Sequence, residues 1–192
     1  QQIAAADIGW SVPADSSRAD DSDGHFSDLQ DRPIRALFKI LPWDWLLSDA
    51  FAAHLARAVL DRRLLVIEPA WKMVPANKAI LALLWEMYPD HPYLLPAFMD
   101  RAAFAPGTTV VAKPLLGREG ANVSVAVIGA DGALQGAPLA SLAGPYGAEG
   151  YVYQALAPLA AGLDVAGRTH HAVIGSWIIG DIARGIGIRE DE

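Results

Sequence analysis

One stretch of the sequence, residues 110–125, combines two cations with a glycine-rich turn between two β-rich runs. Lys113 ends the first run and Arg118 lies at the tip of the turn, where Gly117 and Gly120 allow a tight connection. The stretch therefore predicts a hairpin flap whose backbone N–H groups and positive charges could hold a polyphosphate. An ordinary surface hairpin would show the same pattern, because glycine turns near a lysine are common.

Lys78 is a third cation, placed where an almost wholly apolar helix over residues 78–88 is expected to begin, with Asn77 as its N-cap. The helix dipole makes a positive charge slightly unfavourable at that end. A bound anion would explain the lysine, since a helix N-terminus and an ammonium together attract negative charge. A lysine that extends from the first turn into water explains it as well.

Arg189 and the three acidic residues after it close the sequence, directly behind a β-like run. Carboxylates beside an arginine could hold magnesium or stabilise a phosphoryl group. A solvated chain end gives the same pattern, so the sequence leaves both interpretations open.

The composition limits the classes of function. The chain of 192 residues is 53% hydrophobic and 19% charged, which is typical of a globular protein. The net charge of −7 argues against a general nucleic-acid or anionic membrane surface, so an anionic ligand needs a local cluster of cations. The absence of cysteine excludes disulfides, thiolate metal sites and a catalytic thiol. No apolar run is long enough to span a bilayer, and neither a serine nucleophile elbow nor a phosphate loop is present.

The elements that must position these residues fall into two groups. A short β-like run at residues 3–8 and a polar loop at 11–24 precede a pattern of strand, helix and strand. That order suggests a right-handed crossover with parallel pairing, in a three-layer α/β portion. The second half is expected to be mainly antiparallel sheet. The predicted elements are a buried strand at 34–41, a helix at 43–58, and strands at 64–67, 108–112, 123–128, 151–156, 172–179 and 182–189.

Ordered motifs from about Phe26 to the end of the sequence resemble the glutathionylspermidine synthase family, whose synthetase domain is an ATP-grasp ligase. The loop G-R-E-G-A-N at residues 117–122 looks closest to stand-alone members without an amidase domain. The other motifs are F-S-D-L-Q-D at 26–31, L-F-K-I-L-P-W-D at 37–44, E-P-A-W-K at 68–72, N-K-A-I-L-A-L-L-W-E at 77–86, H-P-Y-L-L-P-A at 91–97, K-P-L-L at 113–116, G-P-Y-G-A-E-G-Y-V-Y-Q-A-L at 144–156, I-G-S-W at 174–177 and G-I-G-I-R-E-D at 185–191.

The resemblance implies roles for individual residues. Lys78 and Lys113 would be the paired lysines that ATP-grasp proteins use on the nucleotide phosphates. Residues 117–122 would form a mobile loop over the γ-phosphate, and residues 154–157 the strand that meets adenine. The expected nucleotide-binding residues are Lys78, Lys113, Gly117, Glu119, Gly120, Gln154, Ala155, Leu156 and Ala157, and the expected catalytic residues are Arg189 and Arg118.

The resemblance also implies a reaction and a fold. ATP would activate a peptide-like carboxylate as an acyl-phosphate, and an amine, such as a polyamine, would then displace phosphate. The implied fold is α+β of the ATP-grasp type, with an α/β portion over residues 1–76 and a nucleotide-binding portion over residues 77–192. The family's Mg²⁺ ligands lie upstream of the matched motifs. We therefore expect a cytoplasmic protein present here as a fragment that binds ATP weakly and turns over little. A non-catalytic nucleotide-binding or protein-interaction module is the alternative.

Overall fold

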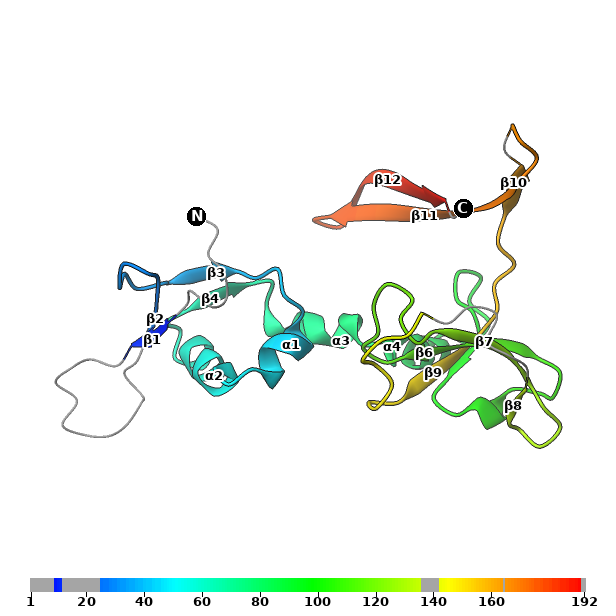
Figure 1. The fold of residues 1–192 in the computed structure, drawn as a ribbon, viewed down its shortest axis with the longest axis horizontal. Helices are drawn as coiled ribbons and strands as arrows, with labels where there is room; N and C mark the ends of the chain where they lie inside the picture. The colour runs from blue at the N-terminus through cyan, green and yellow to red at the C-terminus, as the bar shows by residue number, and fades with distance from the viewer. Residues whose placement is uncertain (1–8, 12–24, 136–141, 164, 191–192) are drawn as a thin grey trace.

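The computed structural model describes residues 9–11, 25–135, 142–163 and 165–190. Figure 1 shows two parts on either side of a connecting segment, which consists of η3 (Ala70–Lys72) and α3 (Met73–Ala76). The β-like run expected at residues 3–8 and most of the polar loop at 11–24 lie outside the described residues. No helix among the described residues is long and apolar enough to cross a membrane.

The N-terminal part contains the predicted strand, helix and strand. The first and last of these strands pair in parallel, as the crossover pattern predicted. A second, antiparallel pair of strands lies beside them (Figure 1). The elements are β1 (Gly9–Ser11), β2 (His25–Ser27), β3 (Ala36–Phe38), α1 (Trp43–Ser48), α2 (Ala52–Leu60) and β4 (Leu65–Ile67).

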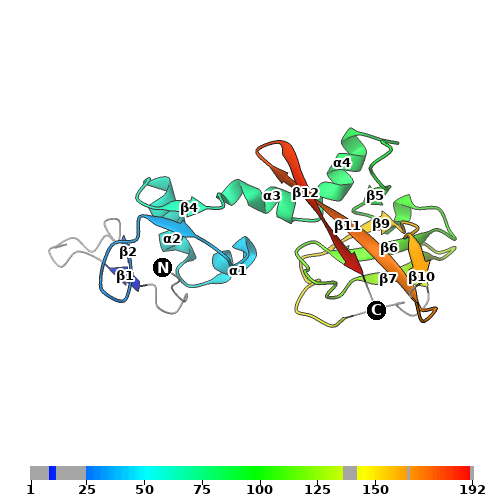
Figure 2. The same cartoon turned by 90° about the horizontal axis from the view of Figure 1, so that it is seen from above.

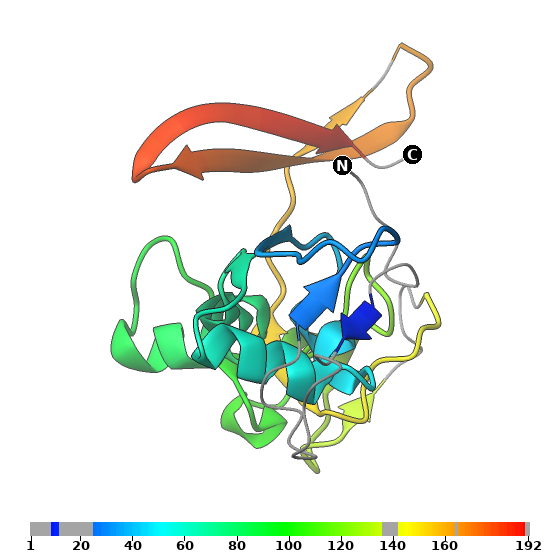
Figure 3. The same ribbon diagram turned by 90° about the vertical axis from the view of Figure 1, so that its left-hand side faces the viewer.

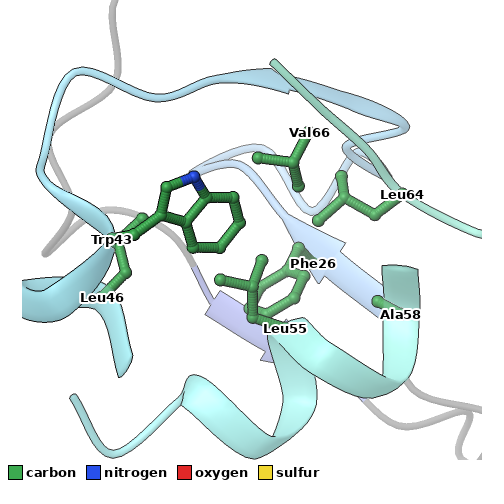
Figure 4. Packing of buried hydrophobic residues seen from close by; sticks show 7 residues of the cluster. All are labelled: Phe26, Trp43, Leu46, Leu55, Ala58, Leu64 and Val66. Atoms are coloured by element: carbon green, nitrogen blue, oxygen red, sulfur yellow. The ribbon is translucent and has the colours of Figure 1, made fainter. Parts of the chain in front are cut away.

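The prediction of a single helix over residues 43–58 is wrong, because the chain forms two helices with a break at Asp49. The backbone of Asp49 is extended (φ −79°, ψ 154°), and its Oδ1 accepts a hydrogen bond from the N–H of Phe51 at 3.1 Å. Such a local side-chain bond competes with the helix. The helical spacing of apolar residues is retained across the break. Figure 4 shows the resulting core, made by Phe26, Trp43, Leu46, Leu55, Ala58, Leu64 and Val66.

The strand at residues 34–41 is shorter and more exposed than predicted. Only Ala36–Phe38 pairs with β4, and Phe38 is 74% exposed. Leu37 packs against the core beside Val66, whereas Phe38 and Leu65 point away from it. The described residues of this part form two separate two-stranded sheets and two helices around this core, and the expected three-layer arrangement remains a prediction.

The C-terminal part is built on a five-stranded sheet with the order β5-β9-β6-β7-β8. Every pairing in it is antiparallel, which confirms the expectation for the second half. Phe104, Val110 and Ile128 form the core on one face of the sheet. Its strands are β5 (Ala97–Phe98), β6 (Thr109–Pro114), β7 (Ser124–Ile128), β8 (Leu134–Gln135) and β9 (Tyr151–Ala155), and the 3-10 helix η4 (Arg101–Ala103) follows β5.

Helix α4 (Ile80–Met87) begins two residues later than the sequence pattern indicated and packs against β5 and β9. None of its residues is buried, and Leu83 and Met87 are 50% and 56% exposed. The prediction that this helix is buried on most of its surface is therefore wrong, because the described residues cover only one side of it.

The last three strands form a separate sheet with the order β10-β11-β12. They are β10 (Ala161–Leu163), β11 (Thr169–Ile179) and β12 (Ile182–Glu190). Figures 1 and 3 show the long β11–β12 hairpin standing away from the five-stranded sheet, and in the view from above it passes across the strands of that sheet (Figure 2). Its apolar side chains, Ile174 and Ile186 among them, are mostly exposed.

Candidate nucleotide site

Lys113 lies near the end of β6, on the face of the sheet opposite the core. Residues alternate along β6, so Val110 and Ala112 are buried while Lys113 is only half-buried. The Lys113 ammonium donates a hydrogen bond to Oε1 of Gln154, on the neighbouring strand β9, at 2.6 Å. Burial lowers the pKa of Lys113, and the positive charge of Lys78 lowers it further. Lys78, the other lysine of the predicted pair, is thus close enough to Lys113 for the two charges to interact.

Lys78 lies in the turn before α4. Its backbone N–H donates to the carbonyl of Leu115 at 2.8 Å, and its ammonium donates to the carbonyl of Gly117. Asn77 accepts a hydrogen bond from the N–H of Ala79 at 2.9 Å, which fixes the turn. Burial lowers the pKa of Lys78, and the charge of Arg118 adds to that effect. The fold thus brings Lys78, Lys113 and the glycine loop together.

The loop over residues 117–122 follows β6 and turns sharply. Glu119, Gly120 and Asn122 all have positive φ, at 53°, 75° and 54°. Gly120 suits such a position because it lacks a Cβ. The N–H of Ala121 donates to the carbonyl of Arg118 at 2.9 Å, which closes the turn. Of the predicted nucleotide-binding residues of the loop, Glu119 and Gly120 lie exposed at its tip, whereas Gly117 is buried.

Arg118, expected to be catalytic, is paired with Asp44 in the first turn of α1. Its Nη1 lies 3.0 Å from Oδ2 of Asp44 and its Nη2 lies 2.5 Å from Oδ1. Nη1 also donates to the hydroxyl of Tyr146 at 3.3 Å and to the carbonyl of Leu116 at 3.2 Å. The hydrogen bond to Arg118 lowers the pKa of Asp44, and the same bond raises the pKa of Arg118.

Asn122 joins the loop to the segment that precedes β9. Its Nδ2 donates to the carbonyls of Gly144 and Tyr146, and its Oδ1 accepts from the N–H of Gly144 at 3.0 Å. Its backbone N–H donates to the carbonyl of Leu142 at 2.6 Å. This one side chain therefore organises two segments that are remote in the sequence.

Glu149 is a residue that the sequence analysis did not select, although it lies in the family motif G-A-E-G-Y. Its carboxylate accepts hydrogen bonds from the backbone N–H groups of Leu116 at 3.2 Å and Gly147 at 2.7 Å. Burial by itself would raise the pKa of Glu149, but these N–H groups and the nearby charge of Lys78 lower it overall. Glu149 is thus a fixed anion at the base of the loop.

Glu149→Gln is expected to destabilise the chain by about 1 kcal/mol at pH 7, because an amide NH₂ cannot accept from a backbone N–H. The folded-state pKa of Glu149 lies below the unfolded value, so its carboxylate stabilises the fold above the unfolded pKa. That contribution disappears as the pH falls through the folded pKa. Urea unfolding of wild type and variant should therefore converge in acid. The exposed Glu86 on α4 offers the control Glu86→Gln, and an equal effect of both substitutions would contradict the assignment.

The segment expected to meet adenine joins the sheet next to β6. Gln154 and Ala155 lie in β9, and Leu156 and Ala157 follow it. The N–H groups of Ala155 and Leu156 donate to carbonyls of neighbouring segments, at 2.9 and 3.2 Å. Hydrogen bonds from this segment to a base would therefore come from the remaining backbone groups.

Arg189 is not brought to the two lysines. It lies in β12, opposite Val173 of β11, in the exposed hairpin. Within the described residues, the side-chain hydrogen bonds of Lys78, Lys113 and Arg118 go to the loop, to Leu116, to β9, to Tyr146 and to α1. The catalytic role of Arg189 remains a prediction from the family resemblance.

The described part of the chain shows no group of three or more His, Asp or Glu side chains that could hold a metal ion. We assign no step of the chemistry to the ion.

Comparison with known proteins gives a family match and several relatives. Residues 4–192 match the family model described as glutathionylspermidine synthase preATP-grasp. The "Putative acid--amine ligase" of Haemophilus influenzae is 41% identical over 193 residues, which cover 99% of this chain and 44% of that protein. The trypanothione synthetase of Crithidia fasciculata is 31% identical, over 88% of this chain and 27% of the relative. The bifunctional glutathionylspermidine synthetase/amidase of Escherichia coli is 29% identical, over 62% of this chain and 21% of the relative. The chain thus spans less than half the length of each of these relatives.

Proposed function

Because this chain belongs to the glutathionylspermidine synthase family, we propose that it supplies the nucleotide phosphate site of an ATP-dependent acid–amine ligase. One observation carries the proposal. Lys78 and Lys113, from separate elements, place two ammonium groups beside a glycine-containing loop. Cations and the backbone N–H groups of a loop are the groups that bind a polyphosphate.

The proposed reaction has two steps. A carboxylate oxygen attacks the γ-phosphorus of ATP, the bond to the bridging oxygen breaks, and ADP leaves. The amine nitrogen then attacks the acyl carbon, the C–O bond to phosphate breaks, and the amine proton passes to solvent. The products are an amide, ADP and phosphate. The acid and amine named for the relatives support a peptide-like carboxylate and an amine as the substrate classes.

Both lysines act through charge in this proposal. Negative charge grows on the phosphate oxygens and on the bridging oxygen as the phosphoryl group moves. Cations already held in place stabilise that charge without reorganisation. The partners of the two ammonium groups here, the Gly117 carbonyl and the Gln154 amide oxygen, would be exchanged for phosphate oxygens. Arg118 and Arg189 are proposed to stabilise the transferring group, as the family resemblance implies.

The test is calorimetric titration of the chain with MgATP, MgADP and adenosine. The phosphate-centred site predicts that affinity falls stepwise from ATP to ADP to adenosine. Equal affinity for adenosine and ATP would refute it. Phosphate release that requires both a carboxylate and an amine would support ligation. ATP binding without such release would favour a non-catalytic nucleotide-binding module.

A further inference from the structure

The ion pair between Asp44 and Arg118 connects the two parts of the molecule. The partners are 74 positions apart in the sequence, one in α1 and the other in the loop after β6. Each terminal nitrogen of the guanidinium donates to a different carboxylate oxygen, Nη1 to Oδ2 at 3.0 Å and Nη2 to Oδ1 at 2.5 Å. This two-pronged geometry is the strong form of the arginine–carboxylate pair. The loop is thus held by a charge from outside its own sheet.

Asp44 offsets a local excess of positive charge. Arg118 lies near enough to Lys78 to lower the pKa of that lysine, and Lys78 acts in the same way on Lys113. Three cations close together repel one another in a partly buried site. Asp44 pairs directly with Arg118, and the carboxylate of Glu149 lies near Lys78.

A phosphate would compete with Asp44 for the same donors. The guanidinium fork fits phosphate and carboxylate oxygens in the same way. The pair is also reachable from solvent, since the side chains of Arg118 and Asp44 are 33% and 19% exposed. The pair can therefore open without uncovering either apolar core.

We propose that Asp44 is a positioning residue, which holds Arg118 and the loop 117–122 against α1 until nucleotide phosphates take the guanidinium in its place. This replacement of Asp44 by phosphate couples triphosphate binding to release of the loop from the N-terminal part. The replacement rests on the proposed function, because it requires the phosphates to bind beside Lys78 and Lys113. The positioning of the loop by Asp44 does not depend on phosphate binding and can be tested separately.

The experiment measures hydrogen exchange of the loop amides in the 192-residue chain. Asp44→Asn should speed hydrogen exchange within residues 117–123 by about tenfold, since that factor corresponds to ~1.4 kcal/mol, which is close to the smallest usual contribution of a hydrogen bond to a charged group. Asp44→Glu should restore part of the protection. Asp61→Asn is the matched control, because it removes a carboxylate that pairs with Arg57 and Arg63 away from the loop. Should Asp44→Asn fail to fold, Arg118→Gln must speed loop exchange in the same way.

The second arm titrates inorganic triphosphate with magnesium. Asp44→Asn should bind it several-fold more tightly than wild type, and the gain should vanish in the Arg118→Gln background. Unchanged loop exchange in both Asp44→Asn and Arg118→Gln would overturn the positioning role. Weaker triphosphate binding by Asp44→Asn would overturn the competition. If neither the wild type nor any variant binds triphosphate, the proposed function fails, and so does the proposed replacement of Asp44 by phosphate. The hydrogen-exchange measurement still decides whether Asp44 positions the loop.

Discussion

Lys113→Met is expected to reduce the affinity for MgATP by about 100-fold while making the chain more stable. The lysine is the more deeply buried of the two, and among the described residues its ammonium donates to a neutral group, Oε1 of Gln154. Removing one member of a desolvated charge pair with phosphate costs about 2–5 kcal/mol of binding. Without bound phosphate, the buried charge of Lys113 lowers the free energy of unfolding. Methionine should therefore stabilise the fold by roughly 0.5–2 kcal/mol, the usual gain when a functional constraint is removed. Calorimetry and urea unfolding measure the two effects.

The stability difference at Lys113 should depend on pH. Its folded-state pKa lies below the unfolded value, so the charged form costs stability at neutral pH. That cost begins to fall as the pH rises through the folded pKa and is gone above the unfolded pKa, so the advantage of Lys113→Met should shrink over this range. Lys72→Met is the control, since Lys72 lies over the ring of Trp71 at 4.4 Å and away from the loop. Unchanged ATP affinity in Lys113→Met would refute the phosphate site.

Asn122→Ala is expected to lower the free energy of unfolding by about 3 kcal/mol, the second large effect. The side chain makes hydrogen bonds to Gly144 and Tyr146, and each partly buried group left unsatisfied costs about 1–3 kcal/mol. Asn122 also has φ of 54°, where alanine is strained and asparagine is tolerated. Urea unfolding measures the total loss.

Two further variants separate these causes. Asn122→Gly removes the hydrogen bonds and relieves the backbone strain, so it should be less destabilising than Asn122→Ala. Asn122→Asp keeps the acceptor for the N–H of Gly144 but loses both donated bonds. A loss below about 0.5 kcal/mol in Asn122→Ala, the size of an ordinary surface substitution, would show that the side chain does not hold the segments together.

The sequence by itself determined the family and most of the strands. The β-rich run before Lys113 predicted β6, and the glycine turn with the β-rich run at 123–128 predicted its pairing with β7. Both signals are local, because β-branched residues favour strands and a tight turn needs particular backbone angles. Ordered motifs gave the family, which the family model over residues 4–192 confirms. The same motifs selected Lys78 and Lys113 as candidates, and their roles are still predictions.

Only the tertiary structure decided which side chains meet. Nothing in the first turn of α1 indicates that Asp44 pairs with Arg118, and nothing in the motif G-A-E-G-Y indicates that Glu149 binds the loop backbone. These contacts join positions far apart in the sequence, so their geometry depends on how the elements pack. Burial is decided in the same way. Strand 36–38 and helix α4 have apolar sequences but remain partly exposed. Hydrophobic periodicity predicts which face of an element would be buried, but it does not show whether other described residues pack against that face.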